Sequence, residues 1–172
     1  MPNWCENKAT IRHPDHDVMK SLVLHYNSEN ICQKLIPVPE SIKSGDNVVE
    51  WCRGAWGTKW DVGAGDYGVE TECYPVTPND EQFVVPAERY RGFPADLDKV
   101  YEMQWKFLSA WAPPEGLYQK LKEVGCYVEA YFYEPGLCFC GTWIDGDVED
   151  YKIEEGNFSS DLISNFPELL QV

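Results

Sequence analysis

The sequence has few basic residues. Lysines and arginines number 14 against 29 aspartates and glutamates, which gives a formal charge of −15. The shortage is greatest in residues 127–172, where Lys152 is the one base. A charge of this sign repels the phosphates of nucleic acids and the headgroups of anionic lipids, and it favours basic partners. We therefore expect a protein partner with a basic surface rather than nucleic acid, although the same acidity also serves solubility.

The sequence also lacks long hydrophobic runs and a secretory leader. No stretch approaches the roughly 18 to 20 apolar residues that cross a membrane. The start, Met1–Asn7, has no basic region followed by an apolar run. Seven cysteines are an odd number, which excludes complete pairing within the chain. We expect reduced cysteines, no membrane partner and a cytoplasmic location.

The residues that are present suffice for one folded domain. Hydrophobic residues make up 44% and aromatic residues 14% of the 172 positions. A chain of this length typically buries roughly 70% of the surface that it exposes when unfolded. We expect a single domain over residues 1–172, with an ordered insertion at about 40–100.

The first 36 residues predict a β-α-β unit. Residues 6–12 favour a short strand, and Asp15 favours the N-terminal cap of a helix that follows it. Apolar residues then recur at helical spacing through about residue 28, at Val18, Leu22 and Tyr26. The segment Ile31–Ile36, which a proline closes, predicts a second strand.

Residues 40–100 are irregular in composition. They are rich in glycine and proline but also contain Trp51, Trp56 and Trp60, so we expect them to form an ordered, loop-rich insertion. Within the insertion we expect a strand at 69–74 and a short helix near 95–100.

Regular structure returns with a strand at 102–110. A helix opened by Pro113-Pro114 and ended by Gly125 follows, and its apolar face carries Leu117, Leu121 and Val124. A strand near 148–153 and a short helix from about Ser160 complete the chain.

Between these elements, residues 127–134 and 137–144 predict a hairpin. A type II turn at Glu134–Leu137 would pair Phe132 with Phe139, Ala130 with Gly141 and Val128 with Trp143, all on the core side. The other face would present three tyrosines, either to solvent or to a covering segment (the C-terminal helix or the insertion): Tyr127, Tyr131 and Tyr133. This order of elements predicts an α+β, ferredoxin-like fold: a split β-α-β sheet with two helices on one face, extra C-terminal hairpin strands and a long loop-rich insertion.

Five blocks of the sequence, taken together, resemble the YubB-like ferredoxin-like family of phages, conjugative plasmids and genomic islands. The blocks are Met1-Pro2-Asn3-Trp4-Cys5 with Asn7, Leu35–Glu40, Trp56–Asp61, Phe107–Pro114, and Tyr133-Glu134 with Gly136. Residues 73–101 are longer than the connection usual in that family. The resemblance implies a protein of a mobile element and supplies no catalytic residues.

Several short motifs are typical of nucleotide-binding or metal-binding sites, but each lacks a residue or a flanking element that such a site needs. Residues 63–68 have the glycine spacing of a dinucleotide loop without the strand and helix that it needs. Residues 145–150 lack the glycine and the final glutamate of a calcium loop. Cys138 and Cys140 would share one face of a strand but have no second ligand pair for zinc. The histidines lie in or just before the first helix, at His13, His16 and His25. We therefore expect no catalytic residue, no cofactor and no metal site.

The candidate partner-binding residues form two sets. The aromatic set combines tryptophans with charges of both signs, as recognition surfaces often do: Trp56, Thr58, Lys59, Trp60, Asp61 and Trp111. The alternative is that these tryptophans hold the insertion against the sheet. The acidic set comprises Asp145, Asp147, Glu149 and Asp150.

These observations favour a non-enzymatic acidic accessory protein of a phage or other mobile element, which binds a host or element protein in the host-cell cytoplasm. In a sharper form of the hypothesis, the acidic C-terminal third mimics DNA and inhibits a basic target. The alternative is an enzyme or small-ligand binder whose pocket is formed by the 40–100 insertion.

Overall fold

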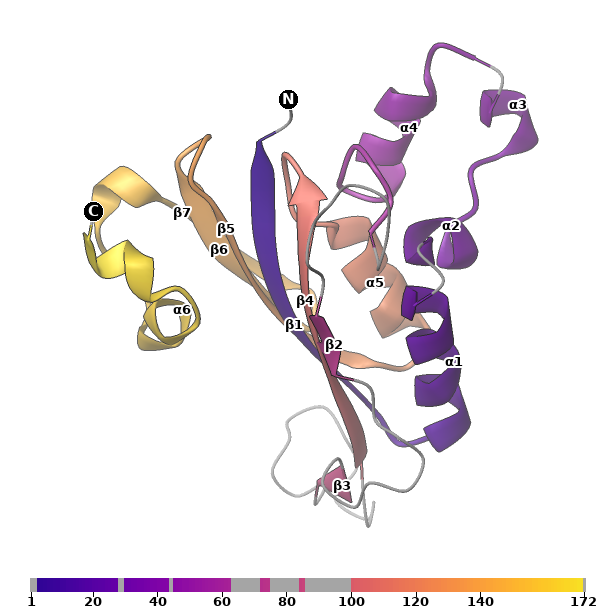
Figure 1. Cartoon of the computed structure of the whole chain (residues 1–172), viewed down its shortest axis with the longest axis horizontal. Helices are drawn as coiled ribbons and strands as arrows, with labels where there is room; N and C mark the ends of the chain where they lie inside the picture. Colours follow the sequence, from indigo (N-terminus) through magenta and orange to yellow (C-terminus); the bar gives the residue numbers. More distant parts are fainter. Residues whose placement is uncertain are drawn as a thin grey trace.

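The computed structural model describes residues 3–27, 30–43, 45–62, 72–74, 84–85 and 100–171. Their strands form one antiparallel sheet in the order β2-β4-β1-β5-β6-β7, with β3 also paired to β4 (Figure 1). The strand bounds are β1 Trp4–His13, β2 Glu72–Tyr74, β3 Val84–Val85, β4 Val100–Ala110, β5 Tyr127–Glu134, β6 Phe139–Ile144 and β7 Asp147–Lys152. The protein therefore has an α+β fold built on an antiparallel sheet.

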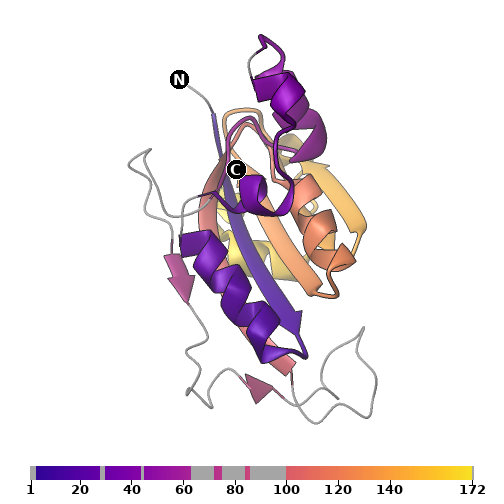
Figure 2. The same cartoon turned by 90° about the vertical axis from the view of Figure 1, so that its right-hand side faces the viewer.

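Helices cover the two faces of this sheet unequally. Helices α1 and α5 lie on one face, here called the inner face, and α6 lies on the opposite, outer face (Figures 1 and 2). The bounds are α1 His16–Asn27, α2 Ile31–Leu35, α3 Glu40–Lys43, α4 Val48–Ala55, α5 Glu115–Glu123 and α6 Ser160–Asn165, with 3-10 turns η3 Ile153–Glu155 and η4 Pro167–Gln171. No helix in the described ranges has the length and apolar character to cross a membrane.

The centre of the sheet is a split β-α-β unit. Strand β1 pairs antiparallel with both β4 and β5, so β4 and β5 run parallel to each other with β1 between them. Helix α5 connects β4 to β5, and Gly125 ends it in a left-handed conformation at φ 93°, as predicted. Helix α1 begins where predicted, because the Asp15 carboxylate accepts hydrogen bonds from the backbone N–H groups of Asp17 and Val18.

The predicted strand at Ile31–Ile36 is wrong, because this segment forms α2. The backbone N–H groups of Cys32 and Gln33 donate to the two carboxylate oxygens of Asp61, at 2.7 and 2.8 Å. A carboxylate at the first turn satisfies donors that have no partner within the helix and complements the helix dipole. The capping group comes from a distant part of the chain, so the apolar run by itself resembled a strand.

The insertion predicted at 40–100 is more regular at its start than its composition suggested. Residues 40–62 contain α3 and α4, and four side chains of α4 recur at helical spacing, at Val48, Trp51, Cys52 and Ala55. Strand β2 lies within the strand predicted at 69–74. Val100 begins β4, while the rest of the helix predicted near 95–100 and the glycine loop at 63–68 lie outside the described residues.

The β5–β6 hairpin forms with a register two residues away from the prediction. Phe132 lies opposite Gly141, and Glu134 lies opposite Phe139. The buried Glu134 carboxylate accepts hydrogen bonds from the N–H groups of Gly136 and Leu137, which stabilises a four-residue loop in place of the tight turn. A shift of two residues keeps the paired residues of β5 and β6 on their predicted faces, because the side-chain period of a strand is two.

Two apolar clusters separate on the two faces of the sheet. The inner cluster joins the sheet to α1, α2, α4 and α5, and it includes fully buried Trp105, Tyr26 and Leu121. The outer cluster is smaller and joins β5 and β6 to the C-terminal segment. Its members are Tyr131, Cys140, Ile153, Leu162, Phe166 and Leu169. Of the two alternatives for the tyrosine face, the structure therefore shows the C-terminal helix as its cover.

Candidate functional site

A groove of about 790 Å³ opens at the upper end of the sheet in Figure 1, where β1 begins and β4 ends. Its walls come from segments far apart in the sequence: Asn3 before β1, Glu50 and Arg53 on α4, Trp111 after β4, and Leu137 in the β5–β6 loop. Four of the five blocks that carry the family resemblance have residues at this end of the sheet. The groove is larger than the second hollow described below, and its volume is within the size range of ligand sites.

Two glycines allow α4 to approach α5 and so set the α4 wall of the groove. The N–H of Gly116 donates to the Trp56 carbonyl at 3.1 Å, and a Cβ on Gly116 would lie 2.0 Å from the Ala55 oxygen. Gly57 has φ 87°, and a Cβ there would lie 2.7 Å from the Glu115 nitrogen. Only residues without a side chain fit this backbone-to-backbone contact.

Trp111 lines the groove with an unusual backbone conformation. Its backbone is left-handed at φ 73°, a conformation that is costly for a bulky residue and concentrates at functional sites. The Trp111 N–H donates to the Asn3 carbonyl at 3.0 Å, which ties this conformation to the start of β1. The indole is half-buried and forms part of the groove wall.

Two cations lie against the Trp111 ring. The Lys59 ammonium is 4.6 Å from the ring centroid, and the Arg53 guanidinium carbon is 5.7 Å from it. Within the part of the chain that the structure describes, neither cation makes an ion pair or a side-chain hydrogen bond. In a protein with twice as many acidic as basic residues, these two cations share one aromatic ring, and Glu50 lines the groove beside them. The arrangement can hold an anionic group beside an apolar surface.

Three residues of the predicted aromatic set serve the fold. Trp56 is 5% exposed and donates from its indole nitrogen to the Ile36 carbonyl at 2.9 Å. The buried Thr58 hydroxyl donates to the Ala110 carbonyl and accepts from the Ala110 N–H. Asp61 caps α2; burial raises the pKa of its carboxyl group, and its backbone N–H donors oppose that shift. All three side chains thus make contacts within the fold.

The other three residues of the aromatic set remain partly accessible. Lys59 lies between the rings of Trp60 and Trp111, at 4.9 and 4.6 Å from their centroids. Trp60 also packs against Trp4, with the two ring centroids 5.9 Å apart. Lys59 and Trp111, 52 positions apart in the sequence, thus meet at the groove.

The acidic set lies elsewhere. Asp145 is in the β6–β7 turn, at the end of β6 opposite the loop that contains Leu137, and its carbonyl accepts a hydrogen bond from the Lys122 ammonium. Asp147, Glu149 and Asp150 lie on β7, and their side chains are exposed. Burial raises the pKa of Asp150, and burial together with Asp150 raises the pKa of Glu115. The two predicted sets therefore do not form one site.

Three residues of the groove were not among the predicted site residues: Arg53, Glu50 and Leu137. Arg53 and Glu50 lie in the segment that was predicted to be irregular, although the helical spacing of its apolar residues would have placed both on the polar side of a helix. Leu137 was assigned to the tight turn of the hairpin, whereas its side chain is 58% exposed at the edge of the groove. An exposed leucine next to an arginine and a tryptophan can be recognised only in three dimensions.

Cys138 and Cys140 do not share a face, which corrects the prediction for this pair. Cys138 lies in the loop at φ 59° and is exposed, whereas Cys140 is buried in the outer cluster. Burial raises the pKa of Cys140 to about 11 and that of Cys126 to about 12, so these thiols stay protonated. Across the described ranges, no three histidine, cysteine or carboxylate side chains gather as metal ligands do.

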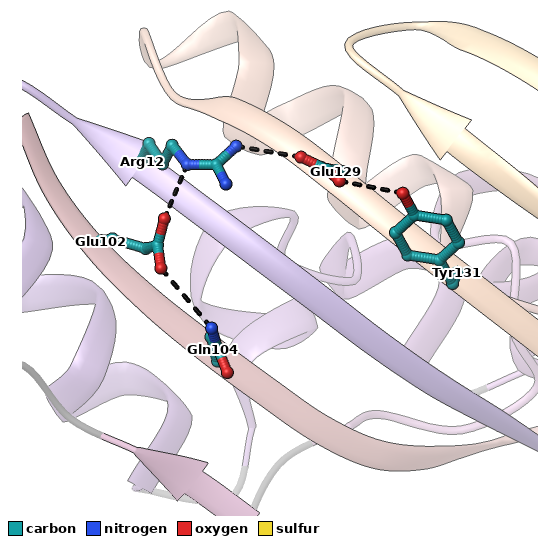
Figure 3. A network of polar contacts seen from close by, with 5 residues as sticks. All are labelled: Arg12, Glu102, Gln104, Glu129 and Tyr131. Carbon is teal, nitrogen blue, oxygen red and sulfur yellow. Dashed lines mark hydrogen bonds and ion pairs between the residues drawn. The ribbon is translucent and has the colours of Figure 1, made fainter. Parts of the chain in front are cut away.

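The outer face carries a polar network beside a second, smaller hollow. Arg12 donates to Glu102 at 2.8 Å and to Glu129 at 3.0 Å, and Glu129 accepts from the Tyr131 hydroxyl (Figure 3). The hollow, of about 350 Å³, lies between the sheet and α6 and is lined mainly by polar side chains. Because the charges of the network satisfy each other, it contributes to the fold rather than offering free binding groups.

Comparison of the chain with protein-family models, with curated proteins and with solved structures finds no match.

Proposed function

We propose that the protein is a non-enzymatic accessory protein of a mobile element, of the YubB-like family, which binds a basic host or element protein in the cytoplasm. The observation that carries the proposal is the acidic edge of the sheet. Strand β7 is the last strand on its side, and it presents Asp147, Glu149 and Asp150 on exposed positions. The described residues place no strand beyond it.

The order of the strands supports the ferredoxin-like part of this proposal. Strands β2, β4, β1 and β5 are neighbours in that order, α1 follows β1, and α5 connects β4 to β5. This is the order of a β-α-β-β-α-β unit in which the two helices cover one face. Strands β6 and β7 then extend the sheet beyond this unit and carry the acidic edge.

The distribution of charge favours a basic partner and opposes DNA or RNA. The acidic side chains of β7 project to both sides of the sheet edge, since neighbouring positions on a strand alternate. An exposed strand edge with like charges resists pairing with a second copy of itself and accepts a partner of opposite sign. At physiological salt the field of these charges extends over about 8 Å, so it would accelerate the association with a basic partner and orient the two proteins.

The test is affinity purification of the tagged protein from host cells after nuclease treatment, with mass spectrometry of the eluate. The decisive variant is Asp147→Asn/Glu149→Gln/Asp150→Asn. The control is Asp17→Asn/Glu40→Gln/Asp46→Asn, which changes the net charge equally at exposed positions far from β7 in the sequence. We expect a basic partner that the first variant captures about tenfold less, since three exposed ion pairs contribute roughly 1.5 kcal/mol. Equal capture by both variants, or no basic partner, would refute the proposal.

A further inference from the structure

Two cations lie against the Trp111 ring: Arg53, which lines the groove together with Glu50, and Lys59. The whole chain carries −15, yet Arg53 and Lys59 both contact the Trp111 ring, and neither has an anionic partner within the described residues. Even Glu50, one helical turn before Arg53 on α4, makes no ion pair with it at 4.0 Å or less. Two unpaired cations held beside one aromatic ring form a preorganised site for an anion.

The same groove has an apolar wall. Leu137 is 58% exposed at its edge, and the half-buried indole of Trp111 faces the same space. An apolar surface next to two cations fits a ligand whose apolar group and anionic group are close together. A volume of about 790 Å³ accommodates a few residues of a peptide or a small organic acid.

The charge of the whole protein limits the ligand to few negative charges. Each added anionic charge is repelled by the net −15, which disfavours nucleotides and polyphosphates. Stacking of a base on Trp111 would also have to displace the Lys59 ammonium, which lies 4.6 Å from the ring centroid. Glu50, at the α4 wall, adds repulsion for any second negative charge.

We propose that the groove binds a single carboxylate attached to an apolar side chain, as presented by the C-terminal residue of a peptide. A terminal residue brings both groups from one Cα, so one residue contacts the cations and the apolar wall together. An aspartate or glutamate side chain would need a second residue for the apolar contact. Arg53 and Lys59 bind the carboxylate, and Trp111 and Leu137 contact the side chain. This inference is independent of the acidic edge at β7, which is at a different part of the sheet.

The experiment uses the whole protein labelled with ¹⁵N and the probe N-acetyl-Gly-Ser-Ala-Leu, with either a free carboxylate or a C-terminal amide. The readout is the indole N–H signal of Trp111, assigned with Trp111→Phe. We expect the free acid to shift this signal, and the amide to bind at least about tenfold more weakly, because a charge-assisted hydrogen bond contributes roughly 1.5–3 kcal/mol. A further arm, N-acetyl-leucine, separates a peptide site from a site for small acids.

Side-chain variants test the roles of the cations. Arg53→Gln and Lys59→Gln should each weaken binding of the acid about tenfold without changing that of the amide. Lys20→Gln, which removes the same charge from an exposed position on α1, should change neither. Glu50→Gln should strengthen binding of the acid by about twofold, since it removes an exposed like charge.

Two outcomes would overturn the proposal. The first is no shift of the Trp111 signal at about 10 mM of the free acid, and the second is equal binding of the acid and the amide. Equal binding of N-acetyl-leucine and the tetrapeptide would support the same carboxylate contacts and would assign the groove to small acids as well as to peptide ends. These outcomes leave the proposed basic partner of β7 untouched, because that proposal is tested by different residues and a different measurement.

Discussion

The inner face of the sheet is covered by α1 and α5 and is packed with apolar side chains, whereas the outer face is divided between two kinds of contact (Figure 1). At one part of the outer face, α6 and η4 cover a small apolar cluster. At another part of the outer face, the charged side chains of Arg12, Glu102 and Glu129 are only partly exposed to solvent. The inner face has the larger apolar layer, and the outer face combines a thin layer with paired charges.

The alternation of side chains along β1 explains the difference. Ala9 and Ile11 point to the inner cluster, while Arg12 and Lys8 point to the outer face. Lys8 is covered there by the C-terminal segment, where it donates to the Asn165 carbonyl and lies 4.7 Å from the centre of the Phe166 ring. A single strand can thus contribute to two layers of different chemistry, and substitutions on each side should have different consequences.

The largest effect is expected on the inner face. Trp105 is fully buried and stacks on Tyr26 with ring centroids 4.8 Å apart. Trp105→Ala should lower the free energy of unfolding by about 4 kcal/mol, because it removes a large side chain from a layer that cannot collapse easily. Urea denaturation measures the change. Trp105→Phe should cost clearly less, since the indole N–H has no hydrogen-bond partner among the described residues. Equal costs for the two variants would contradict this account.

The second-largest loss of stability is expected from substitutions in the charged network around Arg12. Arg12 has a side chain that is 10% exposed, and it separates the carboxylates of Glu102 and Glu129. Arg12→Ala should cost about 3 kcal/mol in unfolding free energy, because it leaves two sheltered like charges without a cation. The triple variant Arg12→Met/Glu102→Gln/Glu129→Gln should recover much of this loss in the same urea experiment. No recovery would mean that Arg12 contributes mainly through the contact of its charge with the Tyr127 ring, which methionine cannot replace.

A smaller loss of stability is expected in the outer cluster, which is covered by the short helix α6 and by η4. Leu162 is fully buried in the outer cluster but belongs to the short helix α6. Leu162→Ala should lower the free energy of unfolding by about 2 kcal/mol. This value is at the low end for a buried leucine replaced by alanine, because a short surface helix can move to reduce the cavity. Hydrogen exchange should show faster exchange in α6 with little change in β1. Faster exchange throughout β1 would show that the two layers unfold together.

The smallest effect concerns the acidic edge. The pKa of Asp150 is raised by burial, and that of Glu115 is raised by burial and by Asp150. A raised pKa means that the folded state binds the proton more tightly, so this contribution to stability is fully present below the ordinary values of 3.8 and 4.5 and is lost as the pH rises through the shifted values. Asp150→Asn should therefore raise the melting temperature at pH 7 and flatten its rise on acidification. An unchanged pH profile would refute the coupling.

The hairpin shows how far pattern alone could predict the structure. The face of every strand residue was predicted, because alternation depends on neighbours in the sequence. The register was wrong by two, because Glu134 turns its carboxylate back onto the loop N–H groups of Gly136 and Leu137. Among the candidate site residues, Trp111 lines the groove and Lys59 lies against its ring, whereas Thr58 and Asp61 make hydrogen bonds within the fold.

The sequence by itself determined the elements whose signals are local: the alternation of β1, β4 and β5, the Asp15 cap of α1, and the Gly125 end of α5. The tertiary structure alone decided the features that depend on distant partners. Asp61 converts an apolar run that resembles a strand into α2, and Gly116 brings α4 close enough for Arg53 to reach Trp111. The physical reason is that periodicity reports which side of an element is buried, whereas a cap, a register or a groove depends on which residues meet after the chain has folded.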